Sequence, residues 1–309
     1  MRPTMETYIT FAIAMLTAPL FPGIILKVKA FFAGKKGPPL LIKYYTVVKL
    51  LRKGSVYSNS TSFVFKLGPT VSFATAIIAL LFFPFAGSSP LFSFNGDVIV
   101  LFYIMGIGRF FTVVAALDTA SPFEGMGAAR EVFFSTLAEV TIFTILILFY
   151  RLNGSLSFAE YFTGDNQICM INASGALLLF VIVALFMVLL TENSRVPVDD
   201  PAIHLELTMI HEVMILDHSG PDLALIELGS FYKLFFYSAF ITQIIYPFTL
   251  ASGIVNGLIF YAILACVYLT IGITESIMAR FKMNLVPQFI LTSFALVFFA
   301  AILTMGVLQ

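Results

Sequence analysis

The side chains best suited to chemistry in this 309-residue sequence are concentrated in residues 192–228, here called the coupling segment. It holds eight of the 17 acidic residues and all three histidines. Because imidazole titrates near neutral pH, histidines beside carboxylates can take up protons and pass them on. The coupling segment is therefore the first place to look for function. Its candidate proton-handling residues are Glu192, Arg195, Asp199, His204, Glu206, His211, Glu212 and Glu227.

The histidine spacing argues against a metal site. His204, His211 and His218 recur every seven residues and would share one helix face. Seven residues rise about 10 Å along a helix, which is too far for two ligands of one ion. His211-Glu212 also misses the spacing of the zinc-protease motif. We predict no metal site; either the histidines relay protons, or they only bond to neighbours or to another subunit.

The coupling segment also predicts an amphipathic helix near residues 201–217. Asp199 and Asp200 before Pro201 are typical of a helix start. Ser219-Gly220-Pro221 is typical of a helix end. Such a helix is too polar to cross a bilayer, so we expect it at the cytoplasmic interface.

A second set of ionisable residues lies inside apolar stretches. Arg109 is one, and Glu131, Ser135 and Glu139 follow one another at four-residue spacing on one helix face. A charge in hydrocarbon costs about 3 kcal/mol or more, so these groups must face water, each other or partner helices. We interpret Glu131 and Glu139 as part of a proton or ion path. The alternative is buried pairs, such as Arg109 with Asp118, that serve assembly alone.

The composition indicates the scaffold that positions these residues. Apolar residues make up 60% of the chain and charged residues only 11%, whereas a soluble domain is nearer half apolar and a quarter charged. A transmembrane helix needs about 20 mostly apolar residues. The sequence thus predicts an all-α membrane protein, with residues 1–309 as a single integral membrane domain. The eight expected spans are residues 6–26, 67–86, 97–117, 131–150, 173–191, 229–248, 252–273 and 286–307.

The charge and cysteine counts exclude two classes of partner for this chain itself. Lys and Arg number 17, as do Asp and Glu, so there is no basic excess to bind nucleic acid. Cys169 and Cys266 are too few to ligate an iron–sulfur cluster, which normally takes about four thiolates. Any such cofactor must belong to another chain.

Lysines and arginines also predict the orientation. Fourteen of the 17 fall in loops on one side of the eight spans, nine of them within residues 27–66, here called the basic loop. Short loops rich in these residues stay in the cytoplasm. We therefore expect the basic loop and the coupling segment to be cytoplasmic, with both chain termini on the opposite side.

The basic loop has a local pattern of its own. Residues 34–39 read as a turn and residues 44–52 as a short interfacial helix. Its charge density is higher than topology requires, so we expect a peripheral subunit to dock there. The alternative is that the charge only enforces topology. The candidate docking residues are Lys35, Lys36, Lys49 and Arg52.

Several motifs resemble a known family. Residues 191–201, Thr-Glu-Asn-Ser-Arg-Val-Pro-Val-Asp-Asp-Pro, resemble the signature loop of the complex I subunit 1 family, the membrane anchor of the peripheral arm in respiratory complex I. Residues 36–38 and 49–50 look like first-loop motifs of that family. Residues 117–123, 127–131 and 201–212 are similar to its membrane-bound hydrogenase branch, of the formate hydrogenlyase subunit 4 and hydrogenase-4 component C type.

The resemblance implies a non-catalytic subunit in a prokaryotic cell (inner) membrane. It implies partners in the form of hydrogenase-like large and small subunits, an iron–sulfur protein and antiporter-like membrane subunits. A [NiFe] centre and iron–sulfur clusters would sit on those partners. Carried over by motif, Glu192, Arg195, Asp199 and Glu206 form the charged loop beside the redox module, and Glu131 and Glu139 lead inward.

Departures from complex I bear on quinone. Complex I members have further glutamates where this chain has Ala202 and His204, and an acidic residue where it has Thr46. These differences argue against a quinone-reducing chamber and favour the hydrogenase branch, with coupling of electron transfer to proton or sodium translocation. The alternatives are a quinone-binding subunit of a complex I type enzyme, a standalone cation or proton transporter, and a purely structural anchor.

Overall fold

The structure is a computed structural model that describes residues 5–163, 167–170, 175–200, 209–248 and 253–307. Over these ranges the chain consists of helices and connecting segments without a strand, and eight of its helical stretches are long and apolar enough to cross a membrane. The prediction of an all-α, eight-span membrane protein is confirmed. The spans are α1 to α2 (Met5–Phe32), α4 (Phe63–Leu81), α5 (Asp97–Asp118), α6 (Pro122–Asn153), α8 (Gly175–Glu192), α10 (Gly220–Ile245), α11 (Gly253–Ile277) and η2 to α12 (Met283–Thr304).

The first span is interrupted, and shorter helices connect the others. α1 (Met5–Thr17) passes through a 3-10 turn at Ala18–Leu20 into α2 (Pro22–Phe32). Prolines open both of the later pieces, because proline fits the first turn of a helix but not its interior. The remaining helices are α3 (Ile42–Leu51), α7 (Phe158–Phe162) and α9 (His211–Met214), and α12 runs over Val286–Val307.

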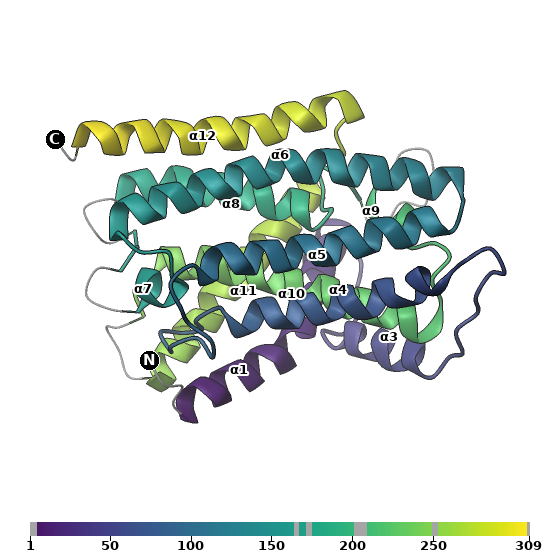
Figure 1. Cartoon of the computed structure of the whole chain (residues 1–309). Coiled ribbons are helices and arrows are strands. Elements are labelled where there is room, and N and C mark those ends of the chain that lie inside the picture. Colours follow the sequence, from purple (N-terminus) through teal and green to yellow (C-terminus); the bar gives the residue numbers. More distant parts are fainter. Residues whose placement is uncertain (1–4, 164–166, 171–174, 201–208, 249–252, 308–309) are drawn as a thin grey trace.

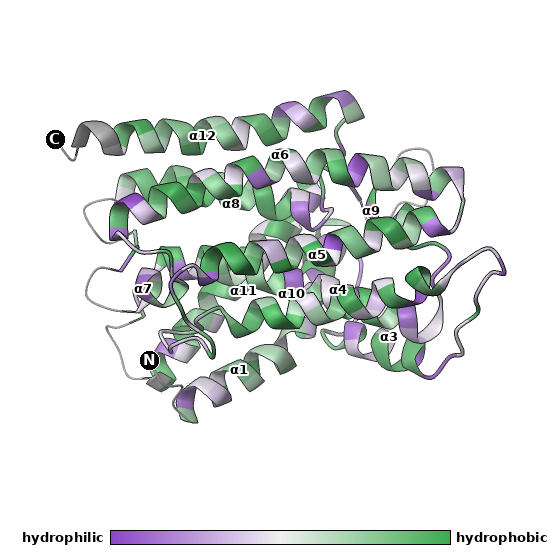
Figure 2. Cartoon of the chain, in the orientation of Figure 1, coloured by the Kyte–Doolittle hydropathy of each residue, from purple (hydrophilic) through white to green (hydrophobic). Residues whose placement is uncertain are grey.

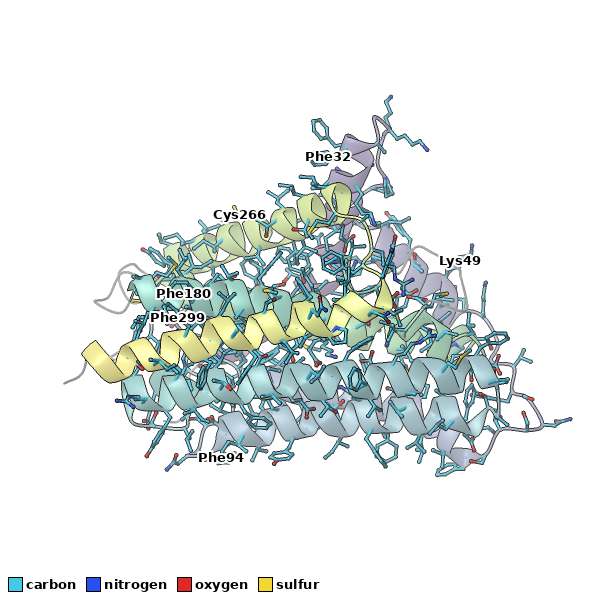
Figure 3. The ribbon with its side chains drawn as sticks, turned by 90° about the horizontal axis from the view of Figure 1, so that it is seen from above. Phe32, Lys49, Phe94, Phe180, Cys266 and Phe299 are labelled. Carbon is cyan, nitrogen blue, oxygen red and sulfur yellow. The ribbon has the colours of Figure 1, made fainter. Side chains whose placement is uncertain are left out.

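Span α10 forms the centre of the bundle. In its most apolar stretch 72% of the residues are buried, against 50% or less in the other spans. It packs against α3, α4, α8 and α11, while α12 lies on the outside against α6 and α8 (Figure 1). Phe180 of α8 and Phe299 of α12 meet edge to face at 5.6 Å (Figure 3). Polar side chains inside the spans therefore meet around α10.

The spans are apolar along most of their length, and hydrophilic residues gather at their ends (Figure 2). Both termini lie at one end of the bundle (Figure 1). The opposite end carries α3, α9 and the loops that join α2 to α4 and α5 to α6 (Figure 1). The basic loop and the described part of the coupling segment therefore share one end, as the Lys and Arg distribution requires. That this end is cytoplasmic remains a prediction.

The basic loop has the expected turn and helix. Gly34 adopts a positive φ of 66° and its N–H binds the carbonyl of Phe31, which ends α2. Glycine tolerates that backbone conformation without strain. Helix α3 then covers Ile42–Leu51, close to the predicted 44–52. It packs Val47 against Ala224 and Phe231 of α10.

The coupling segment differs from the expected single helix. Residues 201–208, with His204 and Glu206, lie outside the described residues. Beyond them, Met209 and Ile210 are not helical, and α9 spans only His211–Met214. Ser219-Gly220-Pro221 begins α10 instead of ending a helix. Proline suits the first turn of a helix as well as the residues after its end, so the sequence pattern alone could not distinguish the two.

Candidate functional site

Four spans bring their charged side chains together inside the bundle. The guanidinium of Arg109 in α5 donates to Glu139 of α6 at 2.6 Å and to Glu192 of α8 at 2.7 Å. Lys233 of α10 lies 2.9 Å from the same carboxylate oxygen of Glu192. Two cations thus balance two carboxylates, which offsets much of the cost of placing each charge in a low-dielectric interior.

The alternative pairing of Arg109 with Asp118 is wrong, and the network includes Lys233, which the sequence does not single out. Arg109 does not pair with Asp118, whose carboxylate accepts the backbone N–H of Ser62 at the loop end of α4 instead. The apolar window starts at residue 229, so the sequence places Lys233 at a loop boundary. Helix α10 begins at Gly220, which puts Lys233 well inside the span. The sequence feature that could have identified Lys233 is its position just inside the apolar window.

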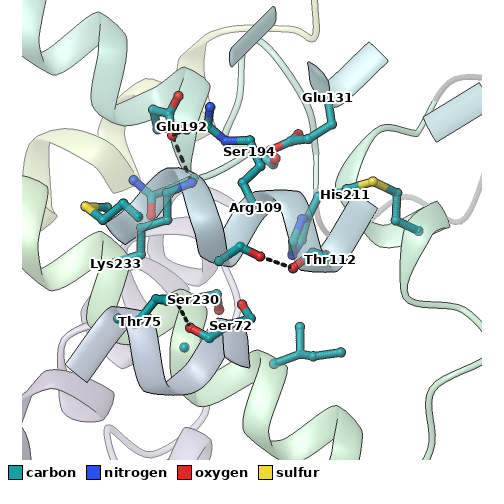
Figure 4. Close-up of a pocket in the computed structure, with 17 residues that line it drawn as sticks. Ser72, Thr75, Arg109, Thr112, Glu131, Glu192, Ser194, His211, Ser230 and Lys233 are labelled. Carbon is teal, nitrogen blue, oxygen red and sulfur yellow. Dashed lines mark hydrogen bonds and ion pairs between the residues drawn. The ribbon is translucent and has the colours of Figure 1, made fainter. Parts of the chain in front are cut away.

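Three members of this network, Arg109, Glu192 and Lys233, line a cavity of about 80 Å³, here called the Arg109 chamber (Figure 4). Glu131 and His211 also face it, together with the hydroxyls of Ser72, Thr75, Thr112, Ser194 and Ser230. A cavity of this size with so many polar groups has room for several water molecules. The chamber can therefore hold a hydrogen-bonded path for protons.

Glu131 stands apart from the ion pairs of this chamber. Its carboxylate accepts a hydrogen bond from Ser135 at 3.5 Å, and within the described ranges no cation forms a salt bridge with it. The predicted stripe of Glu131, Ser135 and Glu139 thus divides in two. Glu139 is paired with Arg109, whereas Glu131 faces the chamber without a salt bridge among the described residues.

A second ion network joins the spans near the coupling segment. Glu275 of α11, with a side chain only 1% exposed, lies 3.1 Å from Lys29 of α2 and 3.3 Å from Arg195. The sequence predicts a role for Arg195 but does not single out Glu275 or Lys29. Both sit at the ends of apolar windows, where charge is usually solvated, so the sequence held no clear signal for the pair.

Asp199 ties the coupling segment to the rest of the protein. Arg280 lies 3.0 Å from its carboxylate. The same carboxylate accepts the backbone N–H groups of Ile210 at 3.0 Å and His211 at 3.3 Å. Carboxylates bind backbone N–H groups strongly because the acceptor is charged. Asp199 is therefore a positioning residue for the backbone at the start of α9.

A second cavity of about 180 Å³, here called the Glu227 chamber, lies against the first. Its ionisable lining residues are Lys29, Lys43, Arg195, Asp199, His211, Glu212, Glu227 and Glu275. One carboxylate oxygen of Glu227 is buried without a hydrogen-bond partner among the described residues. Asn193, Ser194, His211 and Ser230 line both chambers.

His218 has a different environment from His211. Its ring stacks on Phe65 at 3.9 Å with the planes 8° apart, and the residue is 5% exposed. Burial lowers the pKa of His218 to about 4, although the charges of Asp222 and Asp217 oppose that shift. His218 is thus a neutral packing residue at pH 7. The predicted histidine stripe does not extend from His211 to His218.

The candidate docking residues lie on the surface of the basic loop. Lys35, Lys36, Lys49 and Arg52 are exposed. Lys43 packs over the ring of Phe231 at 5.3 Å, so the buried face of α3 is anchored to α10 and Lys49 points outward (Figure 3). The surface can meet a partner, and docking itself stays a prediction.

Comparisons with known proteins cover nearly the whole chain. Residues 5–306 match the sequence model of the NADH dehydrogenase family. Formate hydrogenlyase subunit 4 of Escherichia coli (strain K12) is 27% identical, with 96% of each chain covered. Hydrogenase-4 component C of the same organism is 26% identical, over 92% of this chain and 90% of the relative.

One further relative and one solved structure of similar fold extend the comparison. NADH-ubiquinone oxidoreductase chain 1 of Triticum aestivum is 27% identical, over 74% of this chain and 73% of the relative. The fold is similar to a chain in the solved structure of the membrane-bound sulfane sulfur reductase, an archaeal respiratory membrane complex. The TM-score is 0.82 at 19% identity, with 96% of this chain and 98% of that chain covered.

Removing the shared cation should destabilise the bundle. Arg109→Gln leaves two carboxylates with one cation, and we expect a loss of about 3–5 kcal/mol of stability, measured as a lower thermal midpoint in detergent. Adding Glu139→Gln leaves the pair of Lys233 and Glu192 intact and should recover part of the loss. A double variant no more stable than Arg109→Gln would contradict this account. Arg151→Gln, at the exposed far end of α6, is the control and should have no effect.

The buried histidine predicts a pH dependence. Because the pKa of His218 is about 4 in the folded protein and about 6.5 when unfolded, the unfolded chain binds the proton first. The stability held by neutral His218 is complete above pH 6.5 and is lost as the pH falls towards 4. We expect His218→Phe, which keeps the stack on Phe65, to reduce the loss between pH 7 and 4.5 by on the order of 2 kcal/mol. Parallel pH curves of thermal stability for the two proteins would disprove it.

Proposed function

This chain belongs to the NADH dehydrogenase family, and on that basis we propose that it is the membrane subunit of a hydrogenase-type respiratory complex. In this role it holds the peripheral redox arm on the membrane and couples electron transfer in that arm to proton or sodium translocation. The proposal is supported by relatives of the formate hydrogenlyase and hydrogenase-4 type, which match the chain over nearly its full length.

The observation that carries the proposal is the Arg109 chamber. Charged residues from four spans meet there, and its wall is shared with the Glu227 chamber beside the coupling segment. A protein that served only as an anchor would have no need of two adjoining polar cavities, because polar groups inside a bilayer are expensive to maintain. The presence of these polar cavities inside the bundle therefore supports a role in moving an ion across the membrane.

The coupling itself is electrostatic. A charge added within a few ångströms in a low-dielectric interior changes the energy of nearby ionisable groups by kcal/mol. A redox centre on a docked partner would supply such a charge, and the carboxylates of this chain that line the Glu227 chamber, among them Glu212 and Glu227, would respond to it by binding or releasing protons. Protons then redistribute towards Glu131 in the Arg109 chamber. Electron transfer takes place on partner chains that carry the [NiFe] centre and iron–sulfur clusters.

Glu139 indicates a neighbouring membrane subunit. Its side chain lies inside span α6 and is 41% exposed on the surface of the chain. A carboxylate that faces lipid is costly even when one side of it meets Arg109. An antiporter-like membrane subunit that covers Glu139 would remove that cost and would receive ions from the Arg109 chamber.

The arrangement within the membrane follows from the loops. The end of the bundle that carries α3 and α9 faces the cytoplasm of a prokaryotic cell, and both termini lie on the other side of its membrane. Hydrogenase-like large and small subunits and an iron–sulfur protein then sit on that end, next to the exposed lysines of the basic loop.

Two other functions make different predictions. A complex I type subunit, which the chain 1 relative favours, would bind quinone in the Glu227 chamber and would be inhibited by quinone analogues. A standalone transporter would move ions without companions.

Purification from membranes in mild detergent tests the proposal. We expect a tagged chain to bring down hydrogenase-like and antiporter-like subunits, identified by mass spectrometry. In vesicles the complex should move protons or sodium ions when its electron donor is added, and Na⁺-free buffer separates the two ions. Ion flux by the chain alone, or companions that oxidise NADH together with inhibition by quinone analogues, would contradict the proposal.

The docking surface gives a second prediction. Lys35→Glu combined with Lys36→Glu reverses two exposed charges, and we expect the peripheral subunits to be lost from the purified complex while the membrane subunits remain. The matched control is Lys282→Glu, another lysine at the same end of the bundle but outside the basic loop. An unchanged subunit composition in the double variant would mean that the basic loop sets topology only.

A further inference from the structure

One titratable side chain stands between the two chambers. Among the described residues, Asn193, Ser194, His211 and Ser230 line both cavities, and of these only histidine has an ionisable side chain. On the basis of the function proposed above, we propose that His211 is the relay that passes protons between the Glu227 chamber and the Arg109 chamber.

The backbone that carries His211 is held from several directions. Asp199 binds the N–H groups of Ile210 and His211 and is itself paired with Arg280. From α6, the guanidinium of Arg130 donates to the carbonyl of Met209 at 3.0 Å. A site that must keep a ring between two cavities needs such support, because a displacement of about 1 Å is enough to break a proton path.

Glycine at position 127 allows this segment to approach α6. A Cβ atom added to Gly127 would lie 2.2 Å from a methyl group of Val213 and 2.9 Å from the carbonyl oxygen of Ile210. Any larger residue would push α9 away from α6. The close contact keeps His211 at the wall of the Arg109 chamber, near Thr112 of α5 (Figure 4).

The carboxylates around the two chambers fall into two groups: those paired with cations and those without a salt bridge among the described residues. Glu139, Glu192, Asp199 and Glu275 are paired with cations. Within the described residues, Glu131 on one side and Glu212 and Glu227 on the other form no salt bridge. These three are the groups able to give protons to His211 or take them from it. The charged groups that line the two chambers around His211 are Lys29, Lys43, Arg109, Glu131, Glu192, Arg195, Asp199, Glu212, Glu227, Lys233 and Glu275.

The relay step moves one proton and no electrons. The unprotonated ring nitrogen of His211 accepts a proton from the Glu227 chamber, directly or through water, and imidazolium forms. The other ring nitrogen then releases its proton into the Arg109 chamber, where Glu131 or water accepts it. A neutral ring remains with its proton on the opposite nitrogen, and rotation of the ring restores the starting state. Ser194 and Ser230 also line both chambers, but they would pass protons only through water. A path of water molecules past these serines is therefore the alternative to the relay.

Substitution of His211 in the intact complex tests the relay. We expect His211→Ala to assemble but to move about ten times fewer protons per electron in vesicles. Imidazole added at millimolar concentration should restore much of the loss, because the missing ring leaves a space of its own size. His211→Gln fills that space without a titratable group, so it should be equally impaired and should not respond to imidazole. His218→Phe, which keeps the stack on Phe65, is the matched control, since His218 lies outside both chambers, and it should pump normally.

The outcomes separate the relay from the function itself. If the wild-type complex moves no ions, the proposed function fails. If the wild type pumps and both His211 variants pump equally well, protons pass through water at the serines and the relay is overturned. Transport of Na⁺ without any proton uptake also overturns it. If His211→Ala loses subunits, His211→Gln decides: normal pumping refutes the relay, and loss of pumping with intact subunits supports it.

Discussion

The structure depends on one physical interaction, which is the pairing of charges that four spans carry into the interior of the bundle. Arg109 and Lys233 balance Glu139 and Glu192, and these four residues come from four different spans. Each pair therefore fixes where two spans cross. Because an uncompensated buried charge costs more than a pair contributes, the network defines one arrangement of α5, α6, α8 and α10 against the alternatives that apolar packing alone would allow.

Pairing with cations also distinguishes the carboxylates that support the structure from those that we propose to exchange protons. Glu275 and Asp199 are held by cations at the ends of α2, α8 and α11, so they support the walls of the Glu227 chamber. Glu131 and Glu227 face the chambers without a salt bridge among the described residues. A group whose charge is not locked can respond to a nearby redox event at low cost, and this is the property that coupling requires.

The basic loop and the coupling segment are also linked mechanically. Helix α3 packs on the first turns of α10 through Val47 and Phe231. Further along, the backbone N–H of Val56 donates to the hydroxyl of Ser219, directly before α10 begins. A subunit docked on the basic loop would thus touch elements that continue into the walls of both chambers. The surface on which docking is proposed and the chambers proposed for coupling therefore lie at one end of the bundle.

The sequence by itself determined the number of spans, their approximate bounds and the shared end of the charged loops, because hydropathy and Lys and Arg counts are local properties. It also selected Arg109, Glu131, Glu192 and His211. Only the tertiary structure decided the partners: Arg109 meets Glu139 and Glu192 from 30 and 83 residues away. In the described part of the helix expected over residues 201–217, Met209 and Ile210 are not helical and α9 spans only His211–Met214. Contacts between distant segments depend on how helices rotate and cross, which no local pattern encodes.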